Sequence, residues 1–265
     1  MSSPTHGNLG SEVNSFIGRE RELSELAALL GSARAVTLCG AGGIGKTRLA
    51  QRLLATVAAG YPDGAWFVEL ADLRQPDLVV SRICAAAGIA EEPGRPLLNT
   101  LADALRHRRA LLALDNCEHL IDTCARVCQR LLAAAPGLQV VTTSREPLQV
   151  AAERVWQVPP LSLPAADRPP GAGSDAIRLF ADRAAAARPG FALSPANAAA
   201  VIAVCRRLDG LPLAIELAAA WVRVLSPDQI AGRLGDRFKL LTGGERGGRR
   251  GSARCGPRST GVTTC

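Results

Sequence analysis

The stretch that decides the fold is Gly40-Ala41-Gly42-Gly43-Ile44-Gly45-Lys46-Thr47, which matches the pattern G-x-x-x-x-G-K-[ST] of a phosphate-binding P-loop. The apolar run 35–39 precedes it and is expected to form a buried strand, and residues 47–54 carry apolar side chains at helical spacing. Glycines let backbone N–H groups curl around a phosphate, and a helix N-terminus adds the positive end of a dipole. Strand, glycine loop and helix together predict a nucleotide-phosphate site.

The loop residues have distinct expected roles. Lys46 is expected to reach the β- and γ-phosphates, and the Thr47 hydroxyl is expected to ligate Mg²⁺. The residues expected to hold the nucleotide here are Gly40, Gly42, Gly43, Ile44, Gly45, Lys46, Thr47 and Arg48.

Apolar runs and helical stretches alternate on either side of the loop. Further strands are expected at 65–70, 110–115, 138–145 and 154–158, and helices at 20–30, 76–87, 97–108 and 118–135. The run 110–115 is continuously apolar, as in parallel strands that are buried on both faces. Such alternation predicts a right-handed parallel α/β sheet. We therefore expect a P-loop nucleotide-binding domain over residues 15–160.

The second half of the chain follows a different pattern. A Pro/Gly/Ala-rich linker is expected at 161–173, followed by a purely helical domain at 174–243. Its expected helices are 174–187, 194–208, 213–225 and 226–234, with start signals at Ser194-Pro195 and a capping box at Ser226-Pro227-Asp228-Gln229. Residues 1–14 and 244–265 are expected to be disordered. The predicted fold class is α/β: a parallel P-loop NTPase sheet with flanking helices, followed by a small all-α helical lid domain.

Composition excludes several classes of protein. The net charge of +7 includes five arginines and no acid from Arg246 onward, so residues 1–245 carry only +2 and no nucleic-acid surface is expected. No apolar run reaches the roughly 18 residues of a membrane span, and residues 1–14 lack a signal-peptide pattern, so a cytoplasmic protein is expected. Five cysteines lie in apolar periodic stretches and are expected to be buried and free, namely Cys39, Cys84, Cys124, Cys128 and Cys205.

Acidic residues follow the strand expected at 110–115. Asp115 ends that strand, where an acid suits the second Mg²⁺ contact of a P-loop NTPase. Many hydrolytic P-loop proteins place another acid directly after this Asp to polarise water, but here Asn116 follows, and it cannot accept a proton. Glu118 is the nearest acid. The sequence therefore predicts slow hydrolysis or a base elsewhere.

A polar segment, Thr142-Thr143-Ser144-Arg145, ends the next expected strand. The carboxyl ends of strands line the ligand crevice in such sheets. A hydroxyl of this segment is expected to touch the attacking water, and Arg145 to sense the γ-phosphate. The candidate catalytic residues are thus Lys46, Asp115, Glu118 and Arg145, and the candidate metal ligands are Thr47 and Asp115.

Five ordered motifs carry a family resemblance: F-I-G-R-E at 16–20, the P-loop, L-L-A-L-D-N-C-E-H-L at 111–120, T-T-S-R-E-P-L at 142–148 and G-L-P-L-A-I-E-L-A-A-A at 210–220. Over about residues 15–243 the chain resembles the STAND-class, NB-ARC-like ATPases, with the look of bacterial, especially actinobacterial, LuxR-type and SARP-type transcriptional regulators. The resemblance implies an ATP/ADP switch, closed with ADP and open and self-associating with ATP. It implies that Pro212 packs on the adenine and that Arg145 reads the γ-phosphate. It further implies that the nucleoside is held by Phe16, Ile17, Gly18 and Arg19.

The chain also departs from that family. Its members continue into a winged-helix domain, usually followed by sensor repeats, with a helix-turn-helix at one end, and none of these is recognisable here. The winged helix supplies a His that contacts ADP, so locking of the off-state is in doubt. Helices that pack on that domain are expected to expose Leu234, Phe238, Leu240 and Leu241.

The tail 247–264 lacks periodicity. Residues 254–261, written in GC-rich codons and read two bases out of frame, give L-R-A-A-V-D-W, which is similar to a stretch with which the family continues. We therefore expect a frameshift near Glu245 and a C-terminally truncated product, which the coding DNA around that codon tests.

Two other function classes remain open. A P-loop kinase acting on a small-molecule acceptor would need an acceptor pocket with a base and a lid arginine cluster, and the sequence shows neither. A DNA-binding regulator acting by itself is disfavoured by the near-neutral body and the lack of a helix-turn-helix. The favoured hypothesis is a nucleotide switch that binds ATP or ADP with Mg²⁺, with protein partners or self-association in the ATP-bound form and no membrane or direct nucleic-acid contact.

Overall fold

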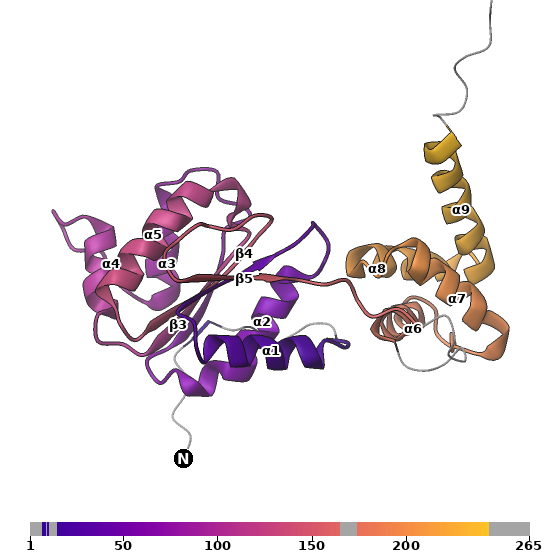
Figure 1. Ribbon diagram of the computed structural model, residues 1–265, viewed down its shortest axis with the longest axis horizontal. Helices are drawn as coiled ribbons and strands as arrows, with labels where there is room; N and C mark the ends of the chain where they lie inside the picture. Colours follow the sequence, from indigo (N-terminus) through magenta and orange to yellow (C-terminus); the bar gives the residue numbers. More distant parts are fainter. Residues whose placement is uncertain (1–6, 9, 11–14, 165–173, 244–265) are drawn as a thin grey trace, which may run out of the picture.

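The computed structural model describes residues 7–8, 10, 15–164 and 174–243, with side chains described as far as residue 235. An α/β unit and a helical unit lie next to each other, joined by the chain that leaves β5 (Figure 1). The tail that was expected to be frameshifted, and most of the expected linker, lie outside the described residues.

The five expected strands are confirmed as one parallel sheet in the order β2-β3-β4-β1-β5. The inner strands are buried because helices cover both faces of the sheet, whereas β5 lies at an edge and is mostly exposed or half-buried. The strands are β1 (Ala35–Cys39), β2 (Ala65–Glu69), β3 (Ala110–Asp115), β4 (Leu138–Ser144) and β5 (Glu153–Gln157).

Two hydrophobic cores lie on opposite faces of the sheet. On one face, Leu26 of α1 and Leu49 and Leu53 of α2 pack against β1 and β3. On the other, α3, α4 and α5 cover β2, β3 and β4. The helices are α1 (Glu20–Leu30), α2 (Lys46–Val57), α3 (Leu78–Ala87), α4 (Leu97–Leu105) and α5 (Ile121–Ala134), with short 3₁₀ turns η1 (Ala58–Gly60) and η2 (Cys117–His119).

The prediction that a helix begins at Glu118 was wrong. Asn116 has a left-handed backbone with φ of 65°, so the chain turns sharply after β3. A 3₁₀ turn then carries Glu118, and the α-helix begins only at Ile121.

The helical unit contains α6 (Asp175–Ala187), α7 (Pro195–Arg207), α8 (Pro212–Ala220), η3 (Trp221–Arg223) and α9 (Pro227–Gly243). The capping box expected at Ser226 is present, since the Ser226 N–H donates to Gln229 Oε1 at 3.0 Å and the Gln229 N–H donates to Ser226 Oγ at 3.3 Å. Phe180, Val201 and Ile215 are among the buried residues of its core.

Leu234 does not stand exposed as expected. It is half-buried and packs against the core of the helical unit, because α9 continues past the expected end of the helix and lies along α7. The side chains of Phe238, Leu240 and Leu241, which were expected to be exposed with it, lie outside the described residues.

Part of the N-terminal segment expected to be disordered contacts the sheet. Gly7 forms a parallel bridge with Ala65. The Asn8 side-chain amide donates to the Phe67 carbonyl at 2.7 Å, and its oxygen accepts from the Phe67 N–H at 2.8 Å. β2 is an edge strand whose backbone groups are open on one side, so these contacts satisfy them.

The five cysteines expected to be buried are buried and free, as is Cys117. No helix within the described ranges is long and apolar enough to span a bilayer. The same residues contain no group of three or more His, Cys, Asp or Glu side chains placed to hold a metal ion.

Candidate functional site

The P-loop connects β1 to α2 at the carboxyl end of the sheet. Gly43 and Gly45 have φ of 77° and 92°, a left-handed conformation that side chains rarely adopt, so these glycines permit the loop's tight curl. Lys46 begins α2 and is 9% exposed. Its Nζ donates to the carbonyl oxygens of Gly40 at 2.8 Å and Ala41 at 3.2 Å, which hold the ammonium at the loop.

Asp115 brings three elements together. Thr47 at the start of α2 donates to Asp115 Oδ2 at 3.0 Å, and Thr143 of β4 donates to Oδ1 at 2.6 Å. Since β3 and β4 are parallel neighbours, their carboxyl ends place Asp115 and Thr143 side by side. Burial raises the pKa of the Asp115 carboxyl above its ordinary value, against the opposing effect of the two hydroxyl donors.

In the polar segment at the end of β4, Thr142 bonds within the sheet whereas Thr143 lines the pocket beside the P-loop. The Thr142 hydroxyl lies 2.6 Å from the Thr37 hydroxyl within the sheet, so Thr142 faces away from the crevice. The Thr143 hydroxyl donates a hydrogen bond to Asp115 Oδ1 and accepts one from the Asn116 N–H at 2.9 Å. The contact of a hydroxyl of this segment with an attacking water stays a prediction.

Arg145 and Glu118 form an ion pair beside the loop. Arg145 Nε lies 3.2 Å from Glu118 Oε1, and the Arg145 side chain is 68% exposed whereas that of Glu118 is 17% exposed. A Cβ built on Gly42 would lie 4.0 Å from Arg145 Nη2, so the guanidinium also borders the P-loop.

Arg19 is a buried arginine, 3% exposed, whose guanidinium braces the P-loop. Its Nη2 donates to the carbonyl oxygens of Ile44 at 2.7 Å and Pro159 at 3.0 Å. Nη1 is buried without a hydrogen-bond partner among the described residues. Burial lowers the pKa of the Arg19 guanidinium, although Glu22 and Asp175 nearby oppose the shift.

The helical unit meets the P-loop through the start of α8. The Leu213 N–H donates to the Gly43 carbonyl at 3.2 Å. A Cβ built on Gly43 would lie 3.0 Å from Leu213 Cβ, and one on Gly45 would lie 3.7 Å from Pro212 Cγ. Pro212 occupies the first turn of α8, where its missing N–H costs nothing.

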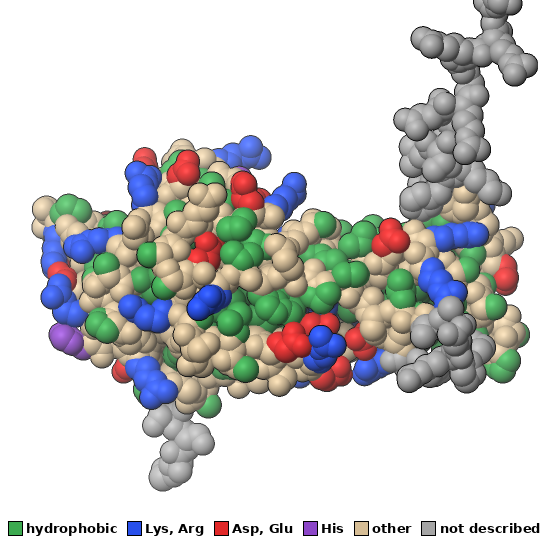
Figure 2. Space-filling view, viewed as in Figure 1, with side chains coloured by type: hydrophobic (Ala, Val, Ile, Leu, Met, Phe, Trp, Pro, Cys, Tyr) green, Lys and Arg blue, Asp and Glu red, His purple; other side chains and the backbone are tan. Residues whose placement is uncertain are grey.

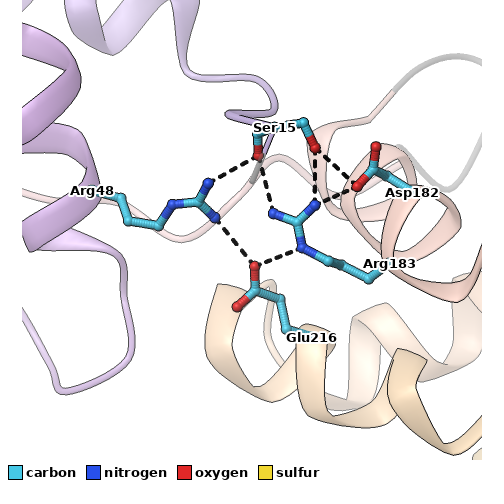
Figure 3. A network of polar contacts seen from close by, with 5 residues as sticks. All are labelled: Ser15, Arg48, Asp182, Arg183 and Glu216. Carbon is cyan, nitrogen blue, oxygen red and sulfur yellow. Dashed lines mark hydrogen bonds and ion pairs between the residues drawn. The ribbon is translucent and has the colours of Figure 1, made fainter. Parts of the chain in front are cut away.

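A polar network joins the two units beside this contact (Figure 3). Arg48 of α2 and Arg183 of α6 lie 3.3 and 3.0 Å from the same oxygen, Oε1 of Glu216 on α8. Both arginines also donate to the Ser15 carbonyl, at 2.9 and 3.0 Å. Asp182 completes the network through Arg183 and the Ser15 hydroxyl.

These residues enclose a pocket of about 310 Å³, a volume within the range of small-molecule sites. Most of the residues predicted from the sequence line it: Phe16, Ile17, Arg19, Gly42, Gly43, Gly45, Lys46, Thr47, Arg48, Glu118, Arg145 and Pro212. Gly18, Gly40, Ile44 and Asp115 do not line it. A Cβ built on Gly18 would collide with Asp175 of α6, so Gly18 serves the contact between the units.

Sequence reasoning missed several residues of the pocket wall: Leu161, Leu179, Leu213 and Glu216. Leu213 and Glu216 carried a usable signal, because both lie within the motif at 210–220. The others reach the pocket through packing of the helical unit on the α/β unit, which spacing along the chain does not encode.

The polar groups in and beside the pocket suit a magnesium nucleotide in their chemistry. Thr47 and Asp115 offer oxygen ligands, and Mg²⁺ commonly takes only one or two protein ligands and completes its shell with phosphate and water. The buried, unpartnered Arg19 Nη1 provides a donor at the wall for an acceptor on a bound ligand.

Comparison with known proteins agrees with this geometry. Residues 29–149 match the family model of an AAA domain. A putative HTH-type transcriptional regulator of Mycobacterium tuberculosis is 47% identical over 222 residues, covering 84% of this chain and 24% of the regulator. The regulatory protein AfsR of Streptomyces griseus is 29% identical over 250 residues, covering 88% of this chain and 24% of AfsR. The chain thus spans about a quarter of the length of these relatives.

The fold recurs among solved structures. A STAND (signal transduction ATPase with numerous domains) protein with a tetratricopeptide repeat sensor from Pyrococcus horikoshii matches with a TM-score of 0.54 at 15% identity, covering 90% of this chain and 34% of that one. At this identity the likeness concerns the fold alone. Residues 29–149 are therefore similar to an AAA-type P-loop ATPase domain, a fold that implies nucleotide binding, in a chain similar to proteins named as bacterial transcriptional regulators.

Proposed function

We propose that this chain is an ATP/ADP-binding switch of the NB-ARC-like STAND type, from a transcriptional regulator of the LuxR or SARP type. The observation that carries the proposal is the contact between the Leu213 N–H and the Gly43 carbonyl. Through it the helical unit touches the phosphate-binding loop itself, so a ligand that shifts the loop also shifts α8. Such a contact is what a nucleotide-dependent rearrangement of two units requires.

In this proposal the two units are residues 15–160 and 174–243, joined by a linker at 161–173. Loop amides, Lys46 and Mg²⁺ hold the phosphates, with the ion on Thr47 and Asp115. Arg19 and the neighbouring residues 16–18 hold the nucleoside, and Pro212 packs on the adenine. Arg145, already between Gly42 and Glu118, reads the γ-phosphate.

The proposed partner of the ATP-bound form is a second copy of this chain. Support comes from an exposed apolar row at helical spacing along α8 and η3, formed by Leu213, Leu217, Trp221 and Val224. Figure 2 shows hydrophobic side chains gathered over the middle of one face, across β5 and toward α8. DNA binding and signal sensing are assigned to other parts of a longer regulator.

Hydrolysis is proposed to be slow. Asn116 stands where a water-activating acid is usual, and α8 closes against the loop. Enzymes commonly turn over at about 1–10³ s⁻¹, and we expect this chain to hydrolyse ATP well below about 1 s⁻¹.

The test measures both nucleotide binding and the overall size of the protein in each nucleotide state. Calorimetry measures the affinities for Mg·ATP and Mg·ADP, and small-angle scattering measures the radius of gyration in each state, with Lys46→Ala as the control that should not respond. We expect binding of both nucleotides and a larger radius with a non-hydrolysable ATP analogue than with ADP. Identical radii in both complexes would refute the switch, and fast transfer of phosphate to an added small-molecule alcohol would instead identify a kinase.

A further inference from the structure

Only one of the two carboxylate oxygens of Glu118 has a hydrogen-bond partner among the described residues. Its Oε1 accepts from Arg145 Nε at 3.2 Å, but Oε2 is buried and has no hydrogen-bond partner within the described ranges. Buried acceptors in folded proteins are nearly always satisfied, so an unsatisfied one calls for a ligand, a water or a catalytic role. Glu118 lines the pocket together with Lys46 and Thr47 of the P-loop.

The turn after β3 is what brings Glu118 there. Asn116 adopts a left-handed backbone directly after Asp115, and its N–H is held by the Thr143 hydroxyl at 2.9 Å. The following 3₁₀ turn, η2, carries Glu118 back toward the carboxyl ends of β3 and β4. An acid three residues after Asp115 thereby reaches the pocket wall.

The side chain of Asn116 is oriented by His119. His119 Nε2 lies 2.8 Å from the Leu73 carbonyl oxygen, which only accepts, so Nε2 carries the proton. In this tautomer Nδ1 is an acceptor, and Asn116 Nδ2 lies 3.4 Å from it, within hydrogen-bonding distance. This leaves Asn116 Oδ1 as an acceptor at the pocket wall, beside Glu118.

We propose that Glu118 is the general base of ATP hydrolysis, replacing the acid that is missing at position 116, and that Asn116 Oδ1 positions the attacking water. The inference rests on the proposed nucleotide function. The water oxygen bonds to the γ-phosphorus while the bond from that phosphorus to the β–γ bridging oxygen breaks. The water proton passes to the Glu118 carboxylate, the products are ADP and inorganic phosphate, and Glu118 later gives its proton to solvent.

In this proposal, Arg145 makes the release of Glu118 as a base depend on whether ATP or ADP is bound. Its guanidinium lies between Glu118 and the loop at Gly42, where a γ-phosphate would compete with the Glu118 carboxylate for it. ATP thus draws Arg145 away and frees Glu118, whereas ADP leaves the ion pair in place. Arg145 is a positioning residue in this step, because it acts on the base.

The experiment uses the full chain and separates binding from chemistry. Calorimetry gives the dissociation constants for Mg·ATP and Mg·ADP, and single-turnover phosphate release from γ-labelled ATP gives the rate. For Glu118→Gln we expect both dissociation constants within about threefold of wild type and a rate at least about 100-fold lower, the usual minimum contribution of a general base. Glu146→Gln removes an exposed acid from the same loop as Arg145 and should change neither quantity.

A second variant tests the base by rescue. Asn116→Asp in the Glu118→Gln background places a carboxylate at the usual position, and Asp tolerates the left-handed backbone there. We expect the double variant to hydrolyse ATP at least about tenfold faster than Glu118→Gln.

The outcomes are distinguishable. Wild-type binding with an unchanged rate in Glu118→Gln would overturn the base while leaving the switch intact, as would wild-type binding with no hydrolysis in a single turnover. Equal loss of binding and rate in a folded Glu118→Gln protein would make Glu118 structural, and failure of the double variant to recover would also overturn the proposal. A wild-type chain that binds neither nucleotide would overturn both this inference and the proposed function.

Discussion

The Leu213 N–H donates to the Gly43 carbonyl at 3.2 Å, so the helical unit is hydrogen-bonded to the backbone of the phosphate-binding loop. Leu213 lies in the first turn of α8. The same helix carries Glu216, which pairs with Arg48 of α2 and Arg183 of α6. The loop and the helical unit therefore share a backbone contact and a charged contact within two turns of one helix. In the proposed function, these contacts couple ligand binding at the loop to the position of the helical unit.

Gly43→Ala should disrupt this contact. A Cβ at this position would lie 3.0 Å from Leu213 Cβ, and the backbone φ of 77° is strained for any side chain. We expect loss of about 1–2 kcal/mol from the strain alone, seen as a lower midpoint in chemical unfolding, together with weaker ADP binding. Leu213→Ala in the same background removes the contact with Leu213 Cδ2 at 3.1 Å but keeps Cβ, so it should recover only part of the loss. Full recovery by Leu213→Ala would show that the backbone is unstrained.

Lys46→Ala should abolish nucleotide binding while the chain stays folded. The ammonium is 9% exposed and donates to two loop carbonyls, so its removal takes away the phosphate charge partner and leaves those carbonyls facing the pocket. Circular dichroism should match wild type, and calorimetry should detect no ATP binding. Wild-type ATP affinity in a folded variant would refute the assignment of the P-loop.

The fold was largely predictable because its signals are local. The P-loop motif, the apolar run ending at Asp115 and the capping box at Ser226 each depend on a few consecutive residues, and the five strands were placed within a residue or two. The site was predictable only where motifs reach it. The ion pair between Glu216 and Arg183 depends on how α6 and α8 pack against each other. The start of α5 was predicted too early because the left-handed backbone of Asn116 turns the chain before the helix can begin.

Asp115→Asn should weaken Mg²⁺-dependent nucleotide binding far more than Mg²⁺-free binding, because it replaces an anionic ligand with a neutral one. Equal weakening of both affinities would show that Asp115 acts only as an acceptor for Thr47 and Thr143.

The same residue predicts a pH dependence of stability. Burial raises the pKa of Asp115 above the ordinary 3.8, so the folded state holds this proton more tightly than the unfolded state. Without Mg²⁺, the free energy of unfolding should therefore fall as pH rises from about 3.8 through the raised pKa. Chemical unfolding at a series of pH values should show this component in wild type and lack it in Asp115→Asn. A component of the same size in both proteins would assign it to another group.

Arg145→Ala should separate ATP from ADP. In the proposed function its guanidinium contacts the γ-phosphate, which ADP lacks. A hydrogen bond to a charged group is worth about 1.5–3 kcal/mol, so ATP affinity should fall roughly ten- to a hundredfold while ADP affinity barely changes. Arg145→Ala also removes the ion-pair partner of Glu118, the proposed base of hydrolysis. Binding should therefore be measured with a non-hydrolysable ATP analogue. An equal loss for both nucleotides would place Arg145 away from the γ-phosphate.

Glu216→Gln should loosen the helical unit while leaving the residues of the P-loop unchanged. One carboxylate oxygen lies 3.3 Å from Arg48 and 3.0 Å from Arg183, and the amide that replaces it keeps the shape but loses the charge. The Glu216 side chain is 31% exposed, so solvent screens the pair and the loss of stability should stay near 1 kcal/mol or below. The matched control is Glu25→Gln, which breaks the exposed Arg21–Glu25 pair within α1. We expect Glu216→Gln, but not Glu25→Gln, to increase the radius of gyration of the ADP complex in small-angle scattering. High salt should produce the same expansion in wild type, because it weakens partly exposed ion pairs. An ADP complex that keeps its compact radius in both conditions would show that the Leu213 contact and apolar packing hold the units together without this network.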